Sequence, residues 1–111
     1  MFETEVQAGI AVLEEKGIGW RSAALHPDLW MRDERYCILG RSIIPTEYSN
    51  GYRTALRDWE VDDEWMARHG FYITDEMIEK FHAPSSGVLY AELEKAWRHA
   101  AQTPGPVPVP A

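Results

Sequence analysis

A single cysteine is the residue of this chain whose chemistry is most easily judged from its neighbours. Cys37 follows Tyr36 and precedes the apolar pair Ile38 and Leu39. Because apolar surroundings raise the pKa of a thiol and lower its reactivity, the sequence favours a small buried core residue over a nucleophile. One cysteine also makes neither an intrachain disulfide nor a cysteine-based zinc site, which is typical of a reducing compartment.

The four histidines are separated by 43, 13 and 17 residues along the chain. They are His26, His69, His82 and His99. These spacings match no short chelating motif, so we expect no metal and no cofactor. His69 precedes Gly70, and a histidine there fits the C-terminal end of a helix, where positive charge is stabilising.

An acidic run with two tryptophans covers residues 58–65. Its members are Asp58, Trp59, Glu60, Asp62, Asp63, Glu64 and Trp65. A calcium loop needs a central glycine, and here Trp59 and Val61 occupy the middle. The run is typical of helix capping with a solvated face. A partner-facing acidic patch and a pair of catalytic carboxylates stay open as alternatives.

The net charge of −7 argues against general affinity for nucleic acid or an anionic membrane, since both associations require many basic residues. Phosphate-binding loops, nucleophile elbows and zinc-protease motifs are absent from the sequence, so no catalytic residue is predicted. Five arginines precede the acidic half and could line a basic patch, whereas three of them, Arg35, Arg41 and Arg57, could equally form ion pairs with those acids. The five are Arg32, Arg35, Arg41, Arg53 and Arg57.

The hydrophobic spacing predicts a mainly α fold, a small single-domain helical bundle of about five short helices. The first helix covers residues 3–16, with Gly17 as its C-terminal cap and with Trp20 and Leu25 folded back on it. The last ends at Gln102. Residues 1–102 form the helical domain, and residues 103–111, rich in proline, form a flexible tail.

The middle of the chain has weaker periodicity. Near residues 29–44 one short extended segment competes with helix, and we favour helix from Cys37 onward. The next helix starts at Thr46, unless Asn50 and the following glycine mark a break. Asp62 or Asp63 caps a short helix, and Thr74 starts another that ends before Pro84.

The first residues carry acids where a signal peptide carries Lys or Arg, and no apolar run approaches the roughly 18 residues that span a bilayer. The sequence therefore predicts a cytoplasmic protein that does not enter a membrane.

Several short patterns follow one another along residues 9–98. They are Gly9-Ile10, Leu13-Glu14-Glu15, Gly19-Trp20, Cys37-Ile38-Leu39-Gly40-Arg41, Tyr48 with Gly51, His69-Gly70-Phe71, and Tyr90, Leu93, Ala96 and Trp97. In order and spacing they resemble a family of short accessory proteins encoded by phages of actinobacteria. The resemblance implies a phage-encoded protein in the host cytoplasm, and it implies no reaction and no catalytic residue.

Five tryptophans are many for 111 residues. Trp20 and Trp97 lie on predicted core faces, whereas Trp30, Trp59 and Trp65 stand beside charges, as the anchors of protein interfaces do. We therefore expect a non-enzymatic binding protein acting on a host or phage protein. The predicted contact residues are Trp59, Glu60, Asp62, Asp63, Trp65, Arg53 and Arg57.

Other functions remain open. The acidic half could mimic nucleic acid and occupy a basic groove of a host enzyme, with binding that weakens as salt rises. A small enzyme built around Cys37 or a histidine is a third interpretation. A homodimer through exposed tryptophans is equally compatible with the sequence.

Overall fold

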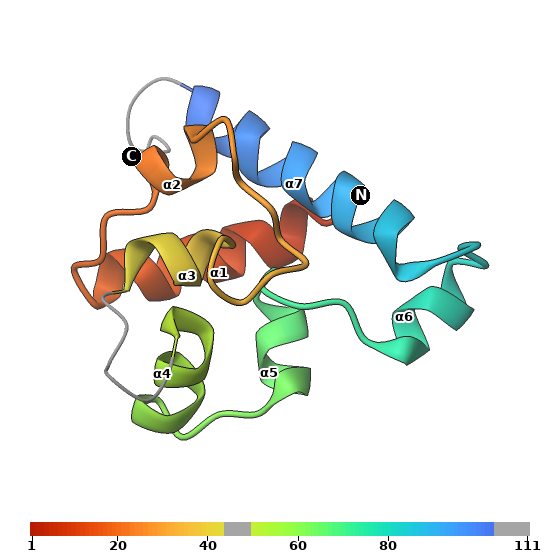
Figure 1. The fold of residues 1–111 in the computed structure, drawn as a ribbon, viewed down its shortest axis with the longest axis horizontal. Coiled ribbons are helices and arrows are strands. Elements are labelled where there is room, and N and C mark those ends of the chain that lie inside the picture. Colours follow the sequence, from red (N-terminus) through yellow and green to blue (C-terminus); the bar gives the residue numbers. More distant parts are fainter. Residues whose placement is uncertain (44–49, 104–111) are drawn as a thin grey trace, which may run out of the picture.

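The computed structural model describes residues 1–43 and 50–103, and these residues form seven α-helices and no strand (Figure 1). The helices are α1 (Glu3–Glu15), α2 (Arg21–Leu25), α3 (Ile38–Ser42), α4 (Gly51–Asp58), α5 (Asp63–Arg68), α6 (Asp75–Lys80) and α7 (Ser86–Gln102). The predicted mainly α fold is confirmed, with more and shorter helices among the described residues than expected. None of these helices is long and apolar enough to cross a membrane.

The alternative of an extended segment does not hold for the described residues 29–43. Successive turns lead into α3 instead, with Asp33 N–H donating to the Trp30 carbonyl and Cys37 N–H donating to the Asp33 carbonyl. The favoured helix after Cys37 is therefore confirmed. The possible helix start at Thr46 and the proline-rich residues 104–111 lie outside the described residues.

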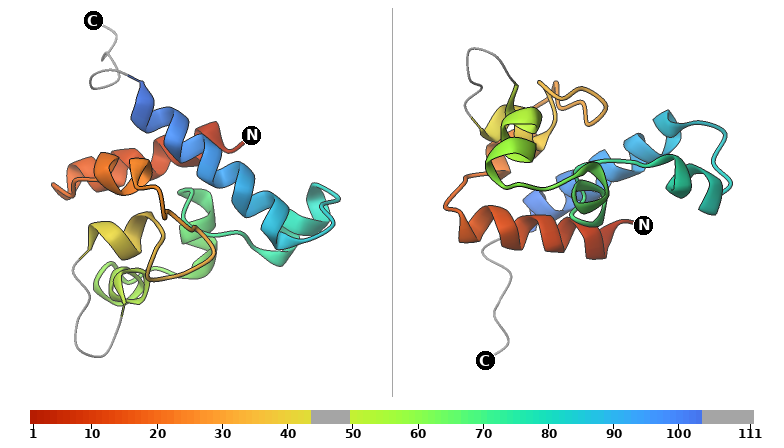
Figure 2. Two further views of the ribbon diagram at one scale, coloured as in Figure 1. Left: turned by 45° about the horizontal axis from the view of Figure 1, so that its top comes forward. Right: turned by 90° about the horizontal axis from the view of Figure 1, so that it is seen from below.

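Two long helices, α1 and α7, cross at the centre of the fold (Figure 2). Each places its apolar stripe in the core, as the sequence predicts, and the buried members include Ile10 and Leu13 of α1 and Leu93 of α7. Gly9 lies at the crossing. A β-carbon at residue 9 would overlap the carbonyl oxygen of His69 and stand 3.2 Å from Cη2 of Trp97, so only glycine allows this approach.

Trp97 joins three parts of the core. Its indole is fully buried, and Nε1 donates a hydrogen bond to the carbonyl of Gly70 at 2.7 Å. The ring stacks on Phe71 at 5.6 Å between centroids and meets the edge of Trp20 at 5.7 Å. The segment after α5 is thereby fixed against α1 and α7.

Four of the short helices, α3 to α6, begin at side-chain caps. The acceptors are the sulfur of Cys37 for α3, the amide of Asn50 for α4, the carboxylate of Asp62 for α5 and the hydroxyl of Thr74 for α6. Each takes a hydrogen bond from a backbone N–H of the first turn that has no partner inside the helix. The predicted starts at Asp62 and Thr74 are confirmed, and so is the break at Asn50.

Two segments are attached less tightly than the sequence predicts. Leu25 at the end of α2 is 46% exposed and does not fold back on α1, although Trp20 is buried as expected. Helix α2 is too short to bury a second side and uses Ala23 and Ala24 for its contact with the core. Helix α6 contains no fully buried residue.

Candidate protein-binding surfaces

The predicted contact residues gather around the turn between α4 and α5, where Trp59 and Trp65 pack edge to face with ring centroids 5.9 Å apart. Trp65 also stacks on the imidazole of His69 at 3.8 Å, and the ammonium of Lys16 lies 4.8 Å above the Trp59 ring. Both indoles are half-buried by these contacts. Part of each indole surface therefore contacts the rest of the fold, and only the remaining exposed part is available to a partner.

The acids of this cluster also have structural roles. Asp62 caps α5 by accepting the N–H of Trp65 at 2.8 Å, and Asp63 accepts the hydroxyl of Tyr52 at 2.8 Å. Burial of Tyr52 and its hydrogen bond to Asp63 raise the pKa of this phenol. Glu60 is exposed and has a left-handed backbone, with φ of 53°.

Both arginines among the predicted contact residues, Arg53 and Arg57, form exposed ion pairs within the chain. Arg53 contacts Glu34 at 3.0 Å, and Arg57 contacts Asp58 at 3.0 Å. Exposed pairs of this kind contribute little to stability, typically about 0–1 kcal/mol. Arg57 stays beside the tryptophan cluster through Asp58, whereas Arg53 is engaged with the turn that precedes α3.

Cys37 is buried at the start of α3, where its sulfur accepts the N–H of Gly40 at 3.4 Å. Burial raises the pKa of this thiol from 9.0 to about 11, so the thiolate is scarce at neutral pH. The predicted buried role is confirmed. Within residues 1–43 and 50–103, no group of three or more His, Cys, Asp or Glu side chains is arranged to hold a metal ion.

A more exposed aromatic surface lies between α2 and α3, and we call Trp30, Tyr36, Arg35 and Arg41 the Trp30 surface. Trp30 is 51% exposed and Tyr36 is 44% exposed. Trp30 N–H donates to the carbonyl of Tyr36 at 3.1 Å, and the guanidinium groups of Arg35 and Arg41 lie 5.6 and 5.3 Å from the Tyr36 ring. Beside these side chains is a hollow of about 330 Å³.

Hydrogen bonds from the Arg41 side chain to backbone carbonyls help to hold the Trp30 surface. Arg41 donates through Nε to the carbonyl of Tyr36 at 3.0 Å and through Nη2 to the carbonyl of Asp28 at 2.8 Å. Trp30 and these arginines were candidates in the sequence, where Trp30 stands beside charges, but the sequence did not join them to Tyr36. The neighbouring charges were the available signal, and the turns that bring the four residues together have no periodic pattern.

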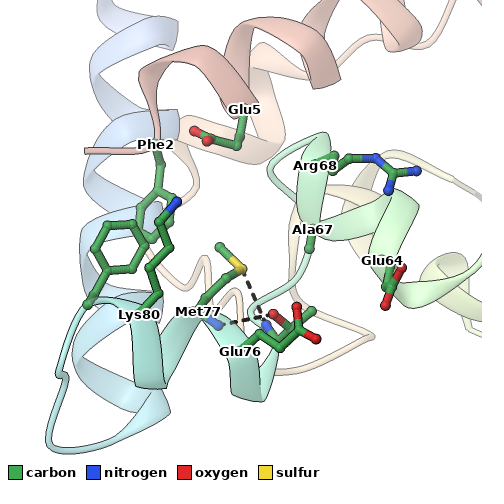
Figure 3. Close-up of a pocket in the computed structure, with 10 residues that line it drawn as sticks. Phe2, Glu5, Glu64, Ala67, Arg68, Glu76, Met77 and Lys80 are labelled. Atoms are coloured by element: carbon green, nitrogen blue, oxygen red, sulfur yellow. Dashed lines mark hydrogen bonds between the residues drawn. The ribbon is translucent and has the colours of Figure 1, made fainter.

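A second hollow, which we call the α6 groove, opens between α1, α5 and α6 (Figure 3). Its volume is about 320 Å³. Apolar side chains and charged side chains both line it, and they are Phe2, Ala67, Met77 and Phe81, with Glu5, Glu64, Glu76, Arg68, Lys80 and Thr74. Sequence reasoning missed this groove because one wall comes from α1, which is distant along the chain from α5 and α6.

Comparison with known proteins finds no family model, no curated protein and no solved structure that matches this chain.

Proposed function

We propose that this protein is a non-enzymatic protein-binding module, encoded by a phage and acting on a host or phage protein in the host cytoplasm. The resemblance of residues 9–98 to accessory proteins of actinobacterial phages supports this origin. The exposure of Trp30 and Tyr36 beside two arginines is the observation that carries the binding role.

Trp, Tyr and Arg are the residue types that contribute most to protein interfaces, because they combine large apolar area with directed polar contacts. In the Trp30 surface all three types stand together. Part of this arrangement is set before any partner arrives, since a backbone hydrogen bond links Trp30 to Tyr36 and the Arg41 guanidinium donates to the carbonyls of Tyr36 and Asp28. A preformed surface loses less conformational entropy on binding, which favours affinity.

The buried thiol of Cys37 supports the non-enzymatic part of the proposal. A nucleophilic cysteine needs a thiolate and access to substrate, and Cys37 has a raised pKa and is enclosed by the core.

The test is recovery of partners from host lysate by the immobilised protein, compared between the wild type and the double variant Trp30→Ala/Tyr36→Ala. The matched control is Val88→Ala, which removes another exposed apolar side chain far along the sequence. We expect at least one partner to be retained by the wild type and the control and lost by the double variant. If all three proteins recover the same partners equally, the Trp30 surface is not the contact.

The sequence-predicted cluster is tested in the same experiment by Glu60→Lys, which reverses an exposed charge beside the two tryptophans. If only this variant fails to recover the partner, the partner binds at the α4–α5 turn and not at the Trp30 surface. Glu60 suits the test better than Asp62 or Trp65, because both of those side chains also stabilise the fold.

The exposed acids of α5 and α6 favour a second candidate function, mimicry of nucleic acid in a basic groove of a host enzyme. Seven carboxylates are exposed in these two helices and the turns before them, and they are Glu60, Asp62, Asp63, Glu64, Asp75, Glu76 and Glu79. A mimic would lose affinity steeply as salt increases. Affinity for the recovered partner that is unchanged between low and physiological salt would rule this function out.

A further inference from the structure

The α6 groove has an apolar floor that is partly open to solvent, because Phe2 and Ala67 are buried whereas Met77 and Phe81 keep exposed surface. Phe2 and Phe81 meet edge to face at 5.8 Å between centroids, and Met77 and Ala67 continue the floor (Figure 3). Phe81 keeps 39% of its surface exposed. A hollow of about 320 Å³ is at the small end of ligand sites, which corresponds to one or two apolar side chains and not to a large cofactor.

Carboxylates from three helices surround this floor. Glu5 comes from α1, Glu64 from α5 and Glu76 from α6 (Figure 3). None of the three has an ion-pair partner among the residues that the structure describes. Three unpaired carboxylates around an apolar floor are suited to a ligand that is apolar at its centre and positively charged at its edges.

Two cations also line the groove, and neither forms an ion pair with these acids. The ammonium of Lys80 lies 5.6 Å from the centroid of the Phe81 ring. Arg68 extends away from Phe2 (Figure 3). The surrounding charge is strongly acidic, because residues 58–82 contain eight Asp and Glu and two Lys and Arg. The field at the opening therefore favours a basic ligand.

Helix α6 forms one wall of the groove and is loosely anchored. It buries no residue fully, and Met77 and Ile78 are its half-buried contacts with the core. Segments with few buried contacts move at little cost in free energy, and methionine adapts its shape to different partners. The groove can therefore widen around a ligand without disturbing the crossing of α1 and α7.

We propose that the α6 groove binds a short, basic, amphipathic helical segment of a partner protein. An apolar side chain of that segment enters between Phe2, Met77 and Phe81, and its Lys or Arg residues face the three glutamates. This binding mode, in which a helix lays its apolar face into a groove, is common in protein recognition. The proposal concerns a surface separate from the Trp30 surface, so either one can fail without the other.

The test uses a synthetic helical peptide of about 14 residues, about four turns, with Leu on one face and Lys on the other. Calorimetry measures its dissociation constant for the wild type and for Glu64→Gln/Glu76→Gln. The matched control is Glu14→Gln/Glu15→Gln, which removes the same charge from exposed positions at the far end of α1. We expect the groove variant to weaken binding by about tenfold and the control by less than about threefold.

Two further measurements keep the result interpretable. A peptide with Ser in place of Leu should bind at least about tenfold more weakly, because it has no apolar side chain for the floor. Amide shifts in the nuclear magnetic resonance spectrum should concentrate at Ala67, Met77 and Phe81. Circular dichroism checks that the exposed Gln substitutions leave the helices intact.

Four outcomes would overturn the proposal. Equal weakening in the groove variant and the control would mean attraction by overall charge. Equal affinity of the Ser peptide would mean that the apolar floor is not used. Shifts centred on Trp30 and Tyr36, or a peptide that does not bind at all, would place basic helices elsewhere or exclude them as ligands.

Discussion

The substitution Gly9→Ala tests the central contact of the fold. Helix propensity predicts that it raises the free energy of unfolding, whereas tertiary packing predicts that it lowers it. Gly9 is inside α1, where alanine is favoured over glycine by about 1 kcal/mol. In the structure the new β-carbon would overlap the carbonyl oxygen of His69 and approach Cζ of Phe71 at 3.1 Å and Cη2 of Trp97 at 3.2 Å.

These neighbours cannot move aside easily. Phe71 and Trp97 are buried and stacked on each other, and the peptide after His69 leads into Gly70, which has φ of 75° and whose carbonyl accepts the Trp97 hydrogen bond. Overpacking a rigid core typically costs about 1–3 kcal/mol, and rigid neighbours place this site at the upper end. After the gain of about 1 kcal/mol from helix propensity, we expect a net loss of about 2 kcal/mol.

The assay is urea unfolding followed by circular dichroism, with thermal unfolding beside it. For a domain of this size a loss of about 2 kcal/mol lowers Tm by about 8–16 °C. The control is Gly19→Ala, where a β-carbon meets no atom within 4 Å and stability should be unchanged or rise by up to about 1 kcal/mol. If Gly9→Ala is as stable as the wild type or more stable, the close crossing of α1 and residues 69–71 is refuted.

Three further substitutions test local features by the same unfolding assay. Asp62→Ala should cost about 1 kcal/mol because α5 loses its cap, whereas Asp58→Ala, which removes an exposed ion pair, should cost less than about 0.5 kcal/mol; equal losses would contradict the capping role. Glu60→Gly should stabilise by about 0.5–1 kcal/mol, since glycine removes a left-handed strain of about 1–2 kcal/mol at some cost in chain entropy, and a loss of stability would contradict this. The fold holds Cys37 as the neutral thiol, so its contribution is complete below about pH 9 and is lost as pH rises toward 11. Cys37→Ser should therefore lose less stability between pH 8 and pH 11 than the wild type, by up to about 3 kcal/mol, and parallel curves would refute the raised pKa.

The parts of the fold that follow from neighbouring residues could be predicted from the sequence. The apolar stripes of α1 and α7, the caps at Asp62 and Thr74 and the left-handed Gly17 depend on residues within one or two turns of each other. Their physics is local, so spacing alone was sufficient.

The Trp30 surface and the α6 groove depend on tertiary contacts that cannot be read from the spacing of residues along the sequence. Tyr36 becomes part of the Trp30 surface because a turn brings its carbonyl to the N–H of Trp30. Phe2 contacts Phe81, which is distant from it in the sequence. For the same reason Trp65 was expected to be freer than it is, since its stacking on His69 follows from helix α5 and not from composition. Exposure is a property of the assembled fold.

Several residues of the short patterns that follow one another along residues 9–98 meet at one place in the structure. Gly9 faces Phe71 and Trp97, and the carbonyl of Gly70 accepts the indole hydrogen bond of Trp97. Tyr90 accepts the N–H of Ile73 through its hydroxyl in the same region. These residues define how α1, the segment after α5 and α7 fit together, so this part of the sequence pattern describes the architecture of the core.

The uneven burial of the tryptophans gives the protein a built-in optical probe. Trp97 and Trp20 are enclosed, Trp59 and Trp65 are half-covered, and Trp30 is 51% exposed. A collisional quencher such as acrylamide will therefore reach Trp30 first, and the emission that it removes will come mainly from the longer wavelengths of a water-exposed indole. A partner seated on that surface would shield this component, so fluorescence can follow complex formation in solution without any attached dye.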